Sequence, residues 1–266
     1  MCSSCNKTSE TRSTPQTEVK KKEVIPEVTF DPEGKIESSR LSSRSTNENG
    51  KLFSRLSSKR TGVKFINPIL KDNPRAYLYA SAMGCGGVAV GDVNGDGKPD
   101  LFFTGGPIPN QLLIQTDNLV FKDVTQRAGV GGGNSWGTGS SIIDIDKDGD
   151  LDIYVCNYDS ANALYLNQGD GTFTESAKSY GLNFISAGHT PAFSDYDLDG
   201  DLDLYLMTNF FYDPRGKTTE RIVGYDPNKN VIVFPKFKKF YGITGRVGDV
   251  VSHDTVGQSD RLLKNN

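Results

Sequence analysis

Short apolar runs alternate with polar turn residues along most of the chain. Runs of this length, rich in β-branched and aromatic residues, are typical of β-strands. The clearest runs are Leu101–Phe103, Ile153–Val155 and Leu204–Leu206. The segment Gly169-Asp170-Gly171 is a tight turn signal and predicts a hairpin. We therefore expect many short strands joined by tight turns.

One unit of this pattern repeats about every 52 residues. Its most distinctive part is a nine-residue acidic loop, which starts at Asp92, Asp144 and Asp195. Asn110 and Asn162 keep the same spacing. A period near fifty residues, with several short strands in each unit, predicts the four-stranded blades of a β-propeller. We expect an all-β fold of about three blades, at about 80–131, 132–183 and 184–266.

The third unit departs from the pattern. Its match to Asn110 and Asn162 begins at Asp260, so about 47 residues, roughly 210–256, are inserted. Aromatic residues and lysines alternate within the insertion, which makes it a candidate contact surface; core packing or a blade-edge hairpin is the alternative. These residues are Phe234, Lys236, Phe237, Lys238, Lys239, Phe240 and Tyr241. Because the pattern stops inside a blade, we expect a partial chain of a larger propeller.

The first sixty residues have a different composition. They hold 18 Ser and Thr, 12 Lys and Arg and 8 Asp and Glu, and they show no sustained periodicity. Such a segment buries too little apolar surface to offset its chain entropy, so residues 1–60 are predicted to be a disordered tail or tether. Since this segment carries +4 and the whole chain carries −3, residues 61–266 carry −7.

The N-terminus reads Met1-Cys2-Ser3-Ser4-Cys5, without the apolar core of a signal peptide. It resembles the mature start of a bacterial lipoprotein, in which Cys2 would carry the lipid; two incidental cysteines in a disordered segment are the alternative. A metal or redox role for this pair lacks a second pair of ligands. The near-neutral net charge favours no nucleic-acid partner. We expect contact with a membrane through a Cys2 anchor alone.

The acidic loops have carboxylates or an amide at positions 1, 3, 5 and 9 and glycine at position 6. Repulsion among these groups is relieved by a hard cation, and oxygen-only ligands favour Ca²⁺. Position 7 would contribute its main-chain carbonyl. The candidate ligands are Asp92, Asn94, Asp96, Lys98 and Asp100; Asp144, Asp146, Asp148, Asp150 and Asp152; and Asp195, Asp197, Asp199, Asp201 and Asp203. We expect up to three structural Ca²⁺ sites, the first the weakest because Asn94 is neutral.

Two other interpretations of these loops were weighed. An EF-hand needs a glutamate at position 12, where this chain has Phe103, Val155 and Leu206, so it is excluded. A hydrophilic turn that never holds a metal is the plain alternative. Three matched copies of the same spacing favour the metal.

The chain shows little that indicates catalysis. It has two histidines, His189 and His253, and neither lies in a known catalytic motif. We expect His189, just before a strand, to be structural; His253 lies in the insertion beside Asp254, and we expect the protein not to be an enzyme. Trp136 and the glycines after it predict close packing of strands, and Cys85 and Cys156 are expected to be small buried residues and not a disulfide.

The segments Gly91–Leu101 and Asn162–Phe173 resemble FG-GAP/VCBS repeats, as in bacterial UnbV/ASPIC-type proteins and, more distantly, integrin α-chains. The resemblance covers about 62–209 and 258–266. It implies a β-propeller, often seven-bladed, with Ca²⁺ in loops between the first two strands of a blade. It also implies an extracellular or cell-surface location and a role in adhesion or ligand binding.

These observations together predict a non-enzymatic, calcium-binding propeller that binds an extracellular protein or glycan at the surface of a bacterial-type cell, with an outer-membrane lipoprotein as one form. Two alternatives stay open. One is the propeller scaffold of a secreted carbohydrate-active enzyme, and the other is a purely structural or assembly module. The sequence favours no particular oligomeric state.

Overall fold

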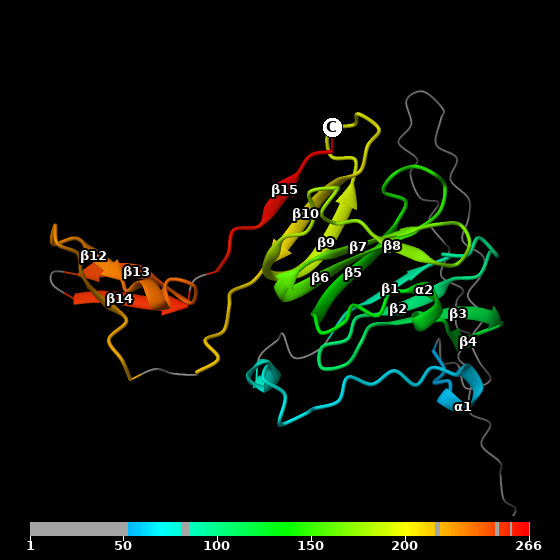
Figure 1. Ribbon diagram of the computed structural model, residues 1–266, viewed down its shortest axis with the longest axis horizontal. Helices are drawn as coiled ribbons and strands as arrows, with labels where there is room; N and C mark the ends of the chain where they lie inside the picture. The colour runs from blue at the N-terminus through cyan, green and yellow to red at the C-terminus, as the bar shows by residue number, and fades with distance from the viewer. Residues whose placement is uncertain (1–52, 81–85, 216–218, 248–249, 256, 266) are drawn as a thin grey trace, which may run out of the picture. The chain divides into compact units, whose positions relative to one another are not determined.

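The computed structural model describes residues 53–80, 86–215, 219–247, 250–255, 257–265, and nearly all of them belong to one unit, Leu56–Asn266. This unit is built from antiparallel strands (Figure 1). The all-β prediction is therefore confirmed. Most of the predicted tail, residues 1–52, lies outside the described residues. Its last part contains a short helix, α1 (Ser58–Thr61), capped by the Ser57 side chain and by Gly62 in the left-handed conformation.

The first group of strands, blade 1, is a four-stranded antiparallel meander in sequence order. Short runs separated by turn residues pair with their neighbours in this way because each connection is brief. Its strands are β1 (Val88–Gly91), β2 (Asp100–Phe103), β3 (Gln111–Asp117) and β4 (Val120–Asp123), and a short helix, α2 (Thr125–Ala128), follows. In its register, Val90 pairs with Leu101 and Leu101 with Leu113.

Blade 2 repeats this meander. Its strands are β5 (Trp136–Ile143), β6 (Asp152–Ala161), β7 (Ala163–Asn167) and β8 (Phe173–Glu175). The turn between β7 and β8 contains Gly169 and Gly171, both with positive φ, and closes with a 3.0 Å bond from Gln168 N to Thr172 O. The hairpin predicted at Gly169–Gly171 is confirmed.

Blade 3 has three strands in the described residues, β9 (Ile185–Ser194), β10 (Asp203–Thr208) and β15 (Arg261–Leu263). Strand β15 pairs with β10 as β3 pairs with β2, although more than fifty residues separate β10 from β15. The end of β6 also pairs with β9 at Tyr158 and Ala187, so blades 2 and 3 share one seven-stranded sheet.

One corner hydrogen bond marks the start of the third strand in each blade. The side chains of Asn110 and Asn162 accept a bond from the backbone N–H five residues earlier, both at 2.9 Å. Asp260 takes this role in blade 3, where it accepts from Thr208 N at 2.7 Å. The same corner therefore forms in blade 3 with a carboxylate in place of an amide.

The insertion forms two hairpins between β10 and β15. Their elements are β11 (Val223–Tyr225), β12 (Val231–Val233), the 3₁₀ turn η2 (Pro235–Phe237), β13 (Tyr241–Val247) and β14 (Val250–Thr255); a second 3₁₀ turn, η1 (Ala76–Ala80), precedes blade 1. Phe237 is fully buried in the small core of these hairpins, beside Ile222 and Val233. This aromatic residue packs internally and is not available to a partner.

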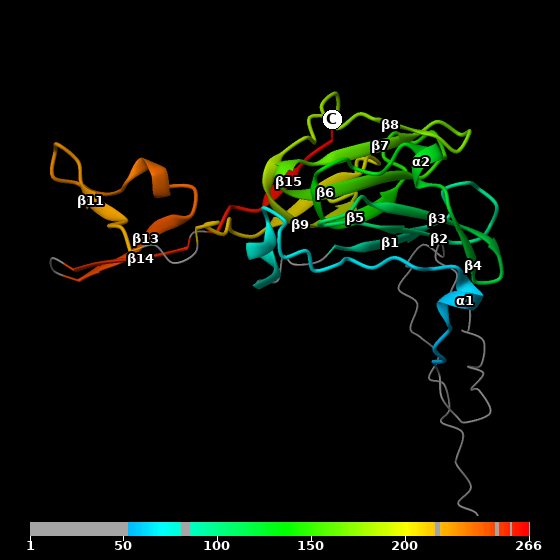
Figure 2. The same ribbon diagram turned by 60° about the horizontal axis from the view of Figure 1, so that its bottom comes forward.

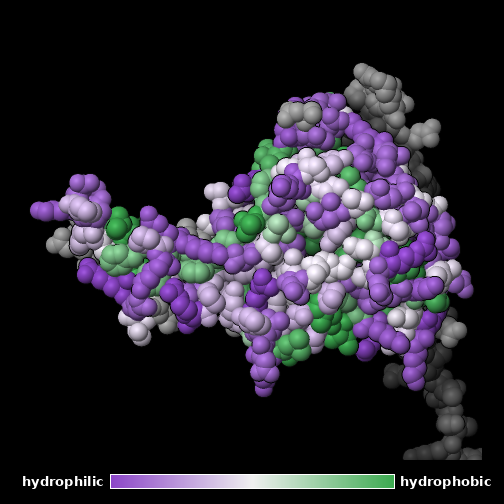
Figure 3. All heavy atoms as spheres, viewed as in Figure 1, coloured by the Kyte–Doolittle hydropathy of each residue, from purple (hydrophilic) through white to green (hydrophobic). Residues whose placement is uncertain are grey.

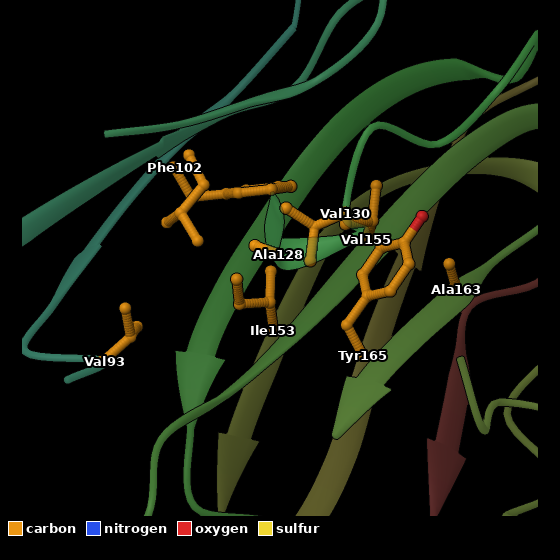
Figure 4. Close-up of a cluster of buried hydrophobic side chains, with 9 residues drawn as sticks. Val93, Phe102, Ala128, Val130, Ile153, Val155, Ala163 and Tyr165 are labelled. Atoms are coloured by element: carbon orange, nitrogen blue, oxygen red, sulfur yellow. The ribbon is translucent and has the colours of Figure 1, made fainter. Parts of the chain in front are cut away.

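The main core lies between neighbouring blades. Phe102 of blade 1 and Ile153 and Val155 of blade 2 belong to one cluster and point into a shared space (Figure 4). Tyr154 and Cys156, on the opposite face of β6, are also fully buried, in a second cluster against blade 3. Strand β6 is thus buried on both faces, as expected for a middle blade. The two views in Figures 1 and 2 show the blades stacked side by side.

Close approach of the inner strands depends on the glycines after Trp136. A Cβ on Gly139 would lie 2.0 Å from the carbonyl oxygen of His189, and one on Gly137 would lie 3.0 Å from that of Gly105. Larger residues would force the strands apart, which confirms the predicted role of this segment. Cys156 is buried and free, as predicted, whereas Cys85 lies outside the described residues.

The surface of the described residues is largely hydrophilic on the face shown in Figure 3, with small apolar patches between polar side chains. No helix in the described part of the chain combines the length and apolar character that crossing a bilayer requires.

Candidate metal centres

The three acidic loops each join the first two strands of a blade. Loop 1 (92–100) connects β1 to β2, loop 2 (144–152) connects β5 to β6, and loop 3 (195–203) connects β9 to β10. Each loop is flanked by strands on both sides, and Phe103, Val155 and Leu206 at position 12 lie within strands. The exclusion of an EF-hand is therefore confirmed.

The glycine at position 6 turns each loop back on its first carboxylate. Its φ is positive in all three loops, between 81° and 96°. Its N–H donates to Oδ2 of the position-1 aspartate. The bonds are Gly97 to Asp92 at 2.7 Å, Gly149 to Asp144 at 3.1 Å and Gly200 to Asp195 at 3.0 Å. Glycine is required because other residues rarely adopt this backbone conformation.

The aspartate at position 9 has a structural role that its spacing alone does not reveal. Asp152 is 1% exposed, and its two oxygens accept bonds from Ile145 N at 3.0 Å and from Asn167 N at 2.8 Å. It therefore ties the start of its loop to the third strand of the blade. The same pair of bonds forms at Asp100 with Val93 and Gln115, and at Asp203 with Tyr196 and Asn265.

Burial of these carboxylates changes their acidity. Desolvation raises the pKa of Asp152 to about 6, and the nearby charges of Asp146 and Asp148 raise it further against the effect of its two backbone bonds. The pKa of Asp100 is raised for the same leading reason. A buried negative charge of this kind is stabilised by a cation.

Loop 2 brings three predicted ligands together. Oxygen atoms of Asp144, Asp146 and Asp148 lie within 4.8 Å of one another. Oδ1 of Asp144 is buried and has no hydrogen-bond partner among the described residues. The same oxygen of Asp92 and of Asp195 accepts a bond from a loop N–H, at 3.1 Å in each case. Loop 2 thus holds an unsatisfied buried carboxylate oxygen inside a cluster of acids.

Loop 3 forms a second cluster with a different membership. Oxygen atoms of Asp195, Asp197 and Asp203 lie within 4.8 Å of one another. The amino group of Lys264 pairs with Asp197 and lies 3.1 Å from Asp199. A lysine therefore already neutralises part of the charge in this loop.

Loop 1 carries less negative charge than the other two loops, as its sequence predicts. Asn94 replaces a carboxylate at position 3, and the Lys98 side chain forms a 2.8 Å ion pair with Asp96. Among the described residues, loop 1 does not form a cluster of three carboxylates like those of loops 2 and 3. The main-chain carbonyl of Lys98 stays a predicted ligand, and the structure shows that the Lys98 side chain brings a positive charge into the loop.

The remaining predicted ligands are placed as follows. Asp152 and Asp100 lie beneath their loops and outside the clusters, whereas Asp203 is a cluster member. Asp150 lines a small hollow of about 310 Å³ between blades 1 and 2. Asp201 forms an ion pair with Lys147 of loop 2.

Oxygen donors supplied by short side chains from one loop are the set of ligands that a hard divalent cation prefers, and loop 2 fits this description best.

Sequence reasoning missed the lysines of this region. Lys147 sits at position 4 of loop 2 and reaches loop 3, while Lys264 follows β15 and reaches the same loop. A lysine within one acidic loop, or after the last strand, is a weak signal, because its partner lies 54 or more residues away in the sequence. The bonds show that loops 2 and 3 are electrostatically linked.

The histidines and the insertion make local contacts. His189 Nδ1 lies 2.9 Å from Thr190 Oγ1, and the ring of His253 packs against Tyr241 with 6.3 Å between centroids. Lys239 pairs with both oxygens of Asp159 at 2.6 and 2.7 Å and lies over the Phe211 ring. The pair with Asp159, which belongs to β6, joins the insertion to blade 2.

Comparison with known proteins identifies the repeats. The model of the FG-GAP-like repeat matches residues 92–155 and 144–206. Each match begins at position 1 of one acidic loop, runs through the next acidic loop and ends in the strand that follows it, β6 for the first match and β10 for the second. Two FG-GAP-like repeats are therefore present in this chain.

Three curated proteins of the same name are similar over part of the chain. Cartilage acidic protein 1 of Mus musculus is 30% identical over 123 residues, which is 45% of this chain and 19% of that protein. The Homo sapiens protein is 29% identical over 123 residues, or 45% and 18%, and that of Xenopus tropicalis is 27% identical over 139 residues, or 51% and 21%. The chain thus matches about a fifth of the length of these relatives.

Proposed function

Because the chain contains FG-GAP-like repeats on propeller-type blades, we propose that it is a non-enzymatic, Ca²⁺-binding β-propeller module that acts outside the cell, in adhesion or in binding a protein or glycan. The observation that carries the calcium part is loop 2. It gathers three carboxylates and leaves Asp144 Oδ1 buried and without a partner among the described residues. An unpaired buried charge is costly unless a cation or donor meets it.

Calcium would have a structural role in this module. Asp144, Asp146 and Asp148 would hold the ion in loop 2, and Asp195, Asp197 and Asp203 would hold it in loop 3. Bound there, the ion supplies positive charge that removes the repulsion among the carboxylates. Asp152 then keeps the loop attached to β7 through its bond to Asn167 N. The expected result is a blade whose stability rises with Ca²⁺ concentration.

Two observations support a location outside the cell. The repeat type resembles that of extracellular and cell-surface proteins, and the similar vertebrate proteins are named for cartilage. The lipid anchor proposed at Cys2 lies outside the described residues and stays part of the proposal. The non-enzymatic assignment is supported by the histidines, whose described contacts are with Thr190 and Tyr241.

Thermal unfolding tests the calcium proposal. Addition of Ca²⁺ to chelator-treated protein should raise the unfolding temperature, with about 2.7 kcal/mol of added stability at a free concentration of one hundred times Kd. Asp144→Asn should lose most of this response. Asp72→Asn, which removes an exposed carboxylate outside the loops, is the control and should respond like the wild type. An unfolding temperature that chelator does not change would contradict the proposal.

The non-enzymatic part has a separate test. Protein saturated with Ca²⁺ is incubated with a panel of soluble polysaccharides, and release of reducing ends and formation of unsaturated products are followed. Both signals should stay at background. Sustained turnover by the wild type that His189→Ala or His253→Ala abolishes would establish the enzyme alternative instead.

A further inference from the structure

Loop 1 contains an asparagine followed directly by a glycine, Asn94-Gly95, and we infer that Asn94 is a site of spontaneous deamidation. In this reaction the main-chain nitrogen of the next residue attacks the carbon of the side-chain amide. Glycine at that next position permits the attack best, because it has no side chain to hinder the approach and restricts the backbone least. Among the described residues, no other asparagine is followed by glycine.

The attacking nitrogen is free in this loop. The N–H of Gly95 donates no hydrogen bond to any described residue. Each loop also has an Asp-Gly pair at positions 5 and 6, where the same attack would isomerise the aspartate. There the glycine N–H is bonded to the position-1 carboxylate, at 2.7 Å for Gly97, 3.1 Å for Gly149 and 3.0 Å for Gly200. Availability of the nitrogen therefore distinguishes Asn94 from these aspartates.

The amide group of Asn94 is also placed for the reaction. Asn94 and Gly95 are both exposed, so water reaches them. Oδ1 of Asn94 accepts from the N–H of Asp96 at 3.1 Å, a donor that it shares with Oδ1 of Asp92 at the same distance. A donor at this oxygen polarises the amide and stabilises the negative charge that develops there during attack. Nδ2, the leaving group, has no hydrogen-bond partner among the described residues.

Comparison of the three loops shows that the fold does not require glycine at position 4. This position has a positive φ in every loop, 69° at Gly95, 63° at Lys147 and 62° at Leu198. Loops 2 and 3 therefore adopt the same backbone conformation with a large side chain. A Cβ on Gly95 would meet no heavy atom within 4 Å. Substitution of Gly95 by either residue is thus a way to block the attack and keep the loop.

The reaction balances with water as the co-reactant. The nitrogen of Gly95 loses its proton to solvent and bonds to Cγ of Asn94, while the bond from Cγ to Nδ2 breaks. The released amino group takes a proton from solvent and leaves as ammonia, and a cyclic succinimide remains. Water then opens the ring at Cγ, which yields an aspartate, or at the main-chain carbonyl carbon, which yields an isoaspartate.

Deamidation would change the charge that distinguishes loop 1 from loops 2 and 3. An aspartate at position 94 gives loop 1 carboxylates at positions 1, 3, 5 and 9, as in the other two loops. Affinity for Ca²⁺ depends on the charge of the ligands, so this product should bind the ion more tightly. Isoaspartate instead lengthens the main chain within the loop. This consequence rests on the proposed function, whereas the deamidation itself does not.

The test incubates the whole chain at alkaline pH, in chelator and in water labelled with heavy oxygen. Asn49-Gly50, the other such pair of the sequence, lies outside the described residues and times the incubation, which continues until Asn49 has converted. Peptide mapping by mass spectrometry should then show Asn94 converted to aspartate and isoaspartate that carry the label. An Asn94 that remains an amide at that point would overturn the inference.

Two variants test the role of the neighbouring nitrogen. Gly95→Lys and Gly95→Leu copy loops 2 and 3 and should each slow the conversion of Asn94 by about tenfold or more. The two are made together so that one suffices if the other fails to fold. Asn134 is the internal control, because the N–H that follows it, that of Ser135, donates to the carbonyl of Gly132 at 3.2 Å; it should stay an amide. Conversion at the wild-type rate in both variants would overturn the inference.

Calorimetric titration with Ca²⁺ measures the consequence separately. Asn94→Asp represents the pure aspartate product, and its loop 1 site should bind about tenfold more tightly than that of the wild type. Asn94→Gln keeps a neutral amide and should not gain affinity. Equal titrations of Asn94→Asp and the wild type would contradict the effect of deamidation on calcium. If none of these proteins bound Ca²⁺, the proposed function would fail and the deamidation result would stand.

Discussion

Blades 1 and 2 share a backbone framework and differ in what is attached to it. In both, a buried aspartate at position 9 bonds the loop to the third strand, and an asparagine closes the corner before that strand. The loops then diverge: loop 2 clusters three carboxylates, while loop 1 has Asn94 and an ion pair between Lys98 and Asp96. The difference separates positions that build a blade from positions that decide what it binds.

The outer edges of the two blades differ in the same way. Blade 2 places Phe184 and Ala163 where blade 1 places Gly131 and Gln111. Ala163 packs in the cluster between blades 1 and 2, and Phe184 packs against the cluster between blades 2 and 3, whereas Gln111 and Gly131 border a hollow. Blade 2 is therefore packed against a neighbouring blade on each side, whereas this edge of blade 1 borders a hollow, although their strands follow the same path.

Removal of a framework aspartate, that is, a position-9 aspartate that bonds its loop to the third strand, should have the largest effect on the free energy of unfolding. Asp152→Ala leaves the buried N–H groups of Ile145 and Asn167 without an acceptor, at about 1–3 kcal/mol each. We expect a loss of about 2–5 kcal/mol in the free energy of unfolding, measured by denaturant titration in chelator. Asp146→Ala, in the same loop but exposed, should cost about 0.5 kcal/mol or less under those conditions.

Equal losses from these two variants would break the distinction between framework and binding positions. The slope of the denaturant transition should be the same in both, since neither changes the surface exposed on unfolding. In the presence of Ca²⁺, the difference between the stability losses of the two variants should become smaller, because Asp146→Ala then also loses the stabilisation that the bound ion provides.

The difference between loops 1 and 2 should appear next, in calcium affinity. Asp144→Ala removes a cluster carboxylate from loop 2, whereas Asp92→Ala removes one from a loop that already contains Asn94. We expect isothermal titration to show at least a tenfold loss of the tightest site in Asp144→Ala, or about 1.4 kcal/mol. Asp92→Ala should leave that site within about threefold. A greater loss in Asp92→Ala would reverse the proposed ranking.

The buried Asp152 also predicts a pH dependence in the absence of metal. Its pKa of about 6 lies above its ordinary value of 3.8, so between these values the folded state binds more protons than the unfolded state. Stability should therefore fall as pH rises through this window. We expect chelated protein to unfold about 2–4 °C higher at pH 5 than at pH 7, which corresponds to about 1 kcal/mol.

Asp152→Asn is the control for this effect, since it cannot ionise, and its unfolding temperature should change less between pH 5 and pH 7. The exposed loop carboxylates Asp96 and Asp199 have pKa values held low, the first by its bond to Lys98 and the second chiefly by a backbone bond from Asp201. They therefore titrate below the window. A wild type that becomes more stable from pH 5 to pH 7 in chelator would contradict the assignment.

Much of the fold could be predicted from the sequence because the repeated spacing determines where the strands of each blade begin. The acidic loops locate the second strand of each blade, and the spacing to Asn110, Asn162 and Asp260 locates the third. The insertion was less predictable. Alternating aromatic residues and lysines are compatible with a surface or with a core, and burial of Phe237 depends on how the chain folds back on Ile222 and Val233, which the alternation does not contain.

The candidate metal centres were predictable only as far as local spacing decides them. Alternation within a loop accounts for the convergence of Asp144, Asp146 and Asp148. Asp100 and Asp152 are aspartates like the predicted ligands, yet they lie outside the clusters and bond to the third strand, whereas Asp203 makes these bonds and also belongs to the loop 3 cluster. The pair formed by Lys147 and Asp201 depends on the packing of blade 2 against blade 3, which no local pattern contains.

The smallest change in the free energy of unfolding is expected for Asp260→Asn, at the corner of blade 3. Asp260 accepts from Thr208 N at 2.7 Å, as the asparagines do in blades 1 and 2, and also accepts from the Tyr205 hydroxyl at 2.8 Å. Asp260→Asn keeps the acceptor and restores the residue of the other blades, so the free energy of unfolding should change by about 0.5 kcal/mol or less. Asp260→Ala removes the acceptor and should cost about 1–2 kcal/mol. If denaturant titration shows that Asn and Ala cost the same, the corner in blade 3 depends on the charge of Asp260 and differs from the corners that asparagine closes.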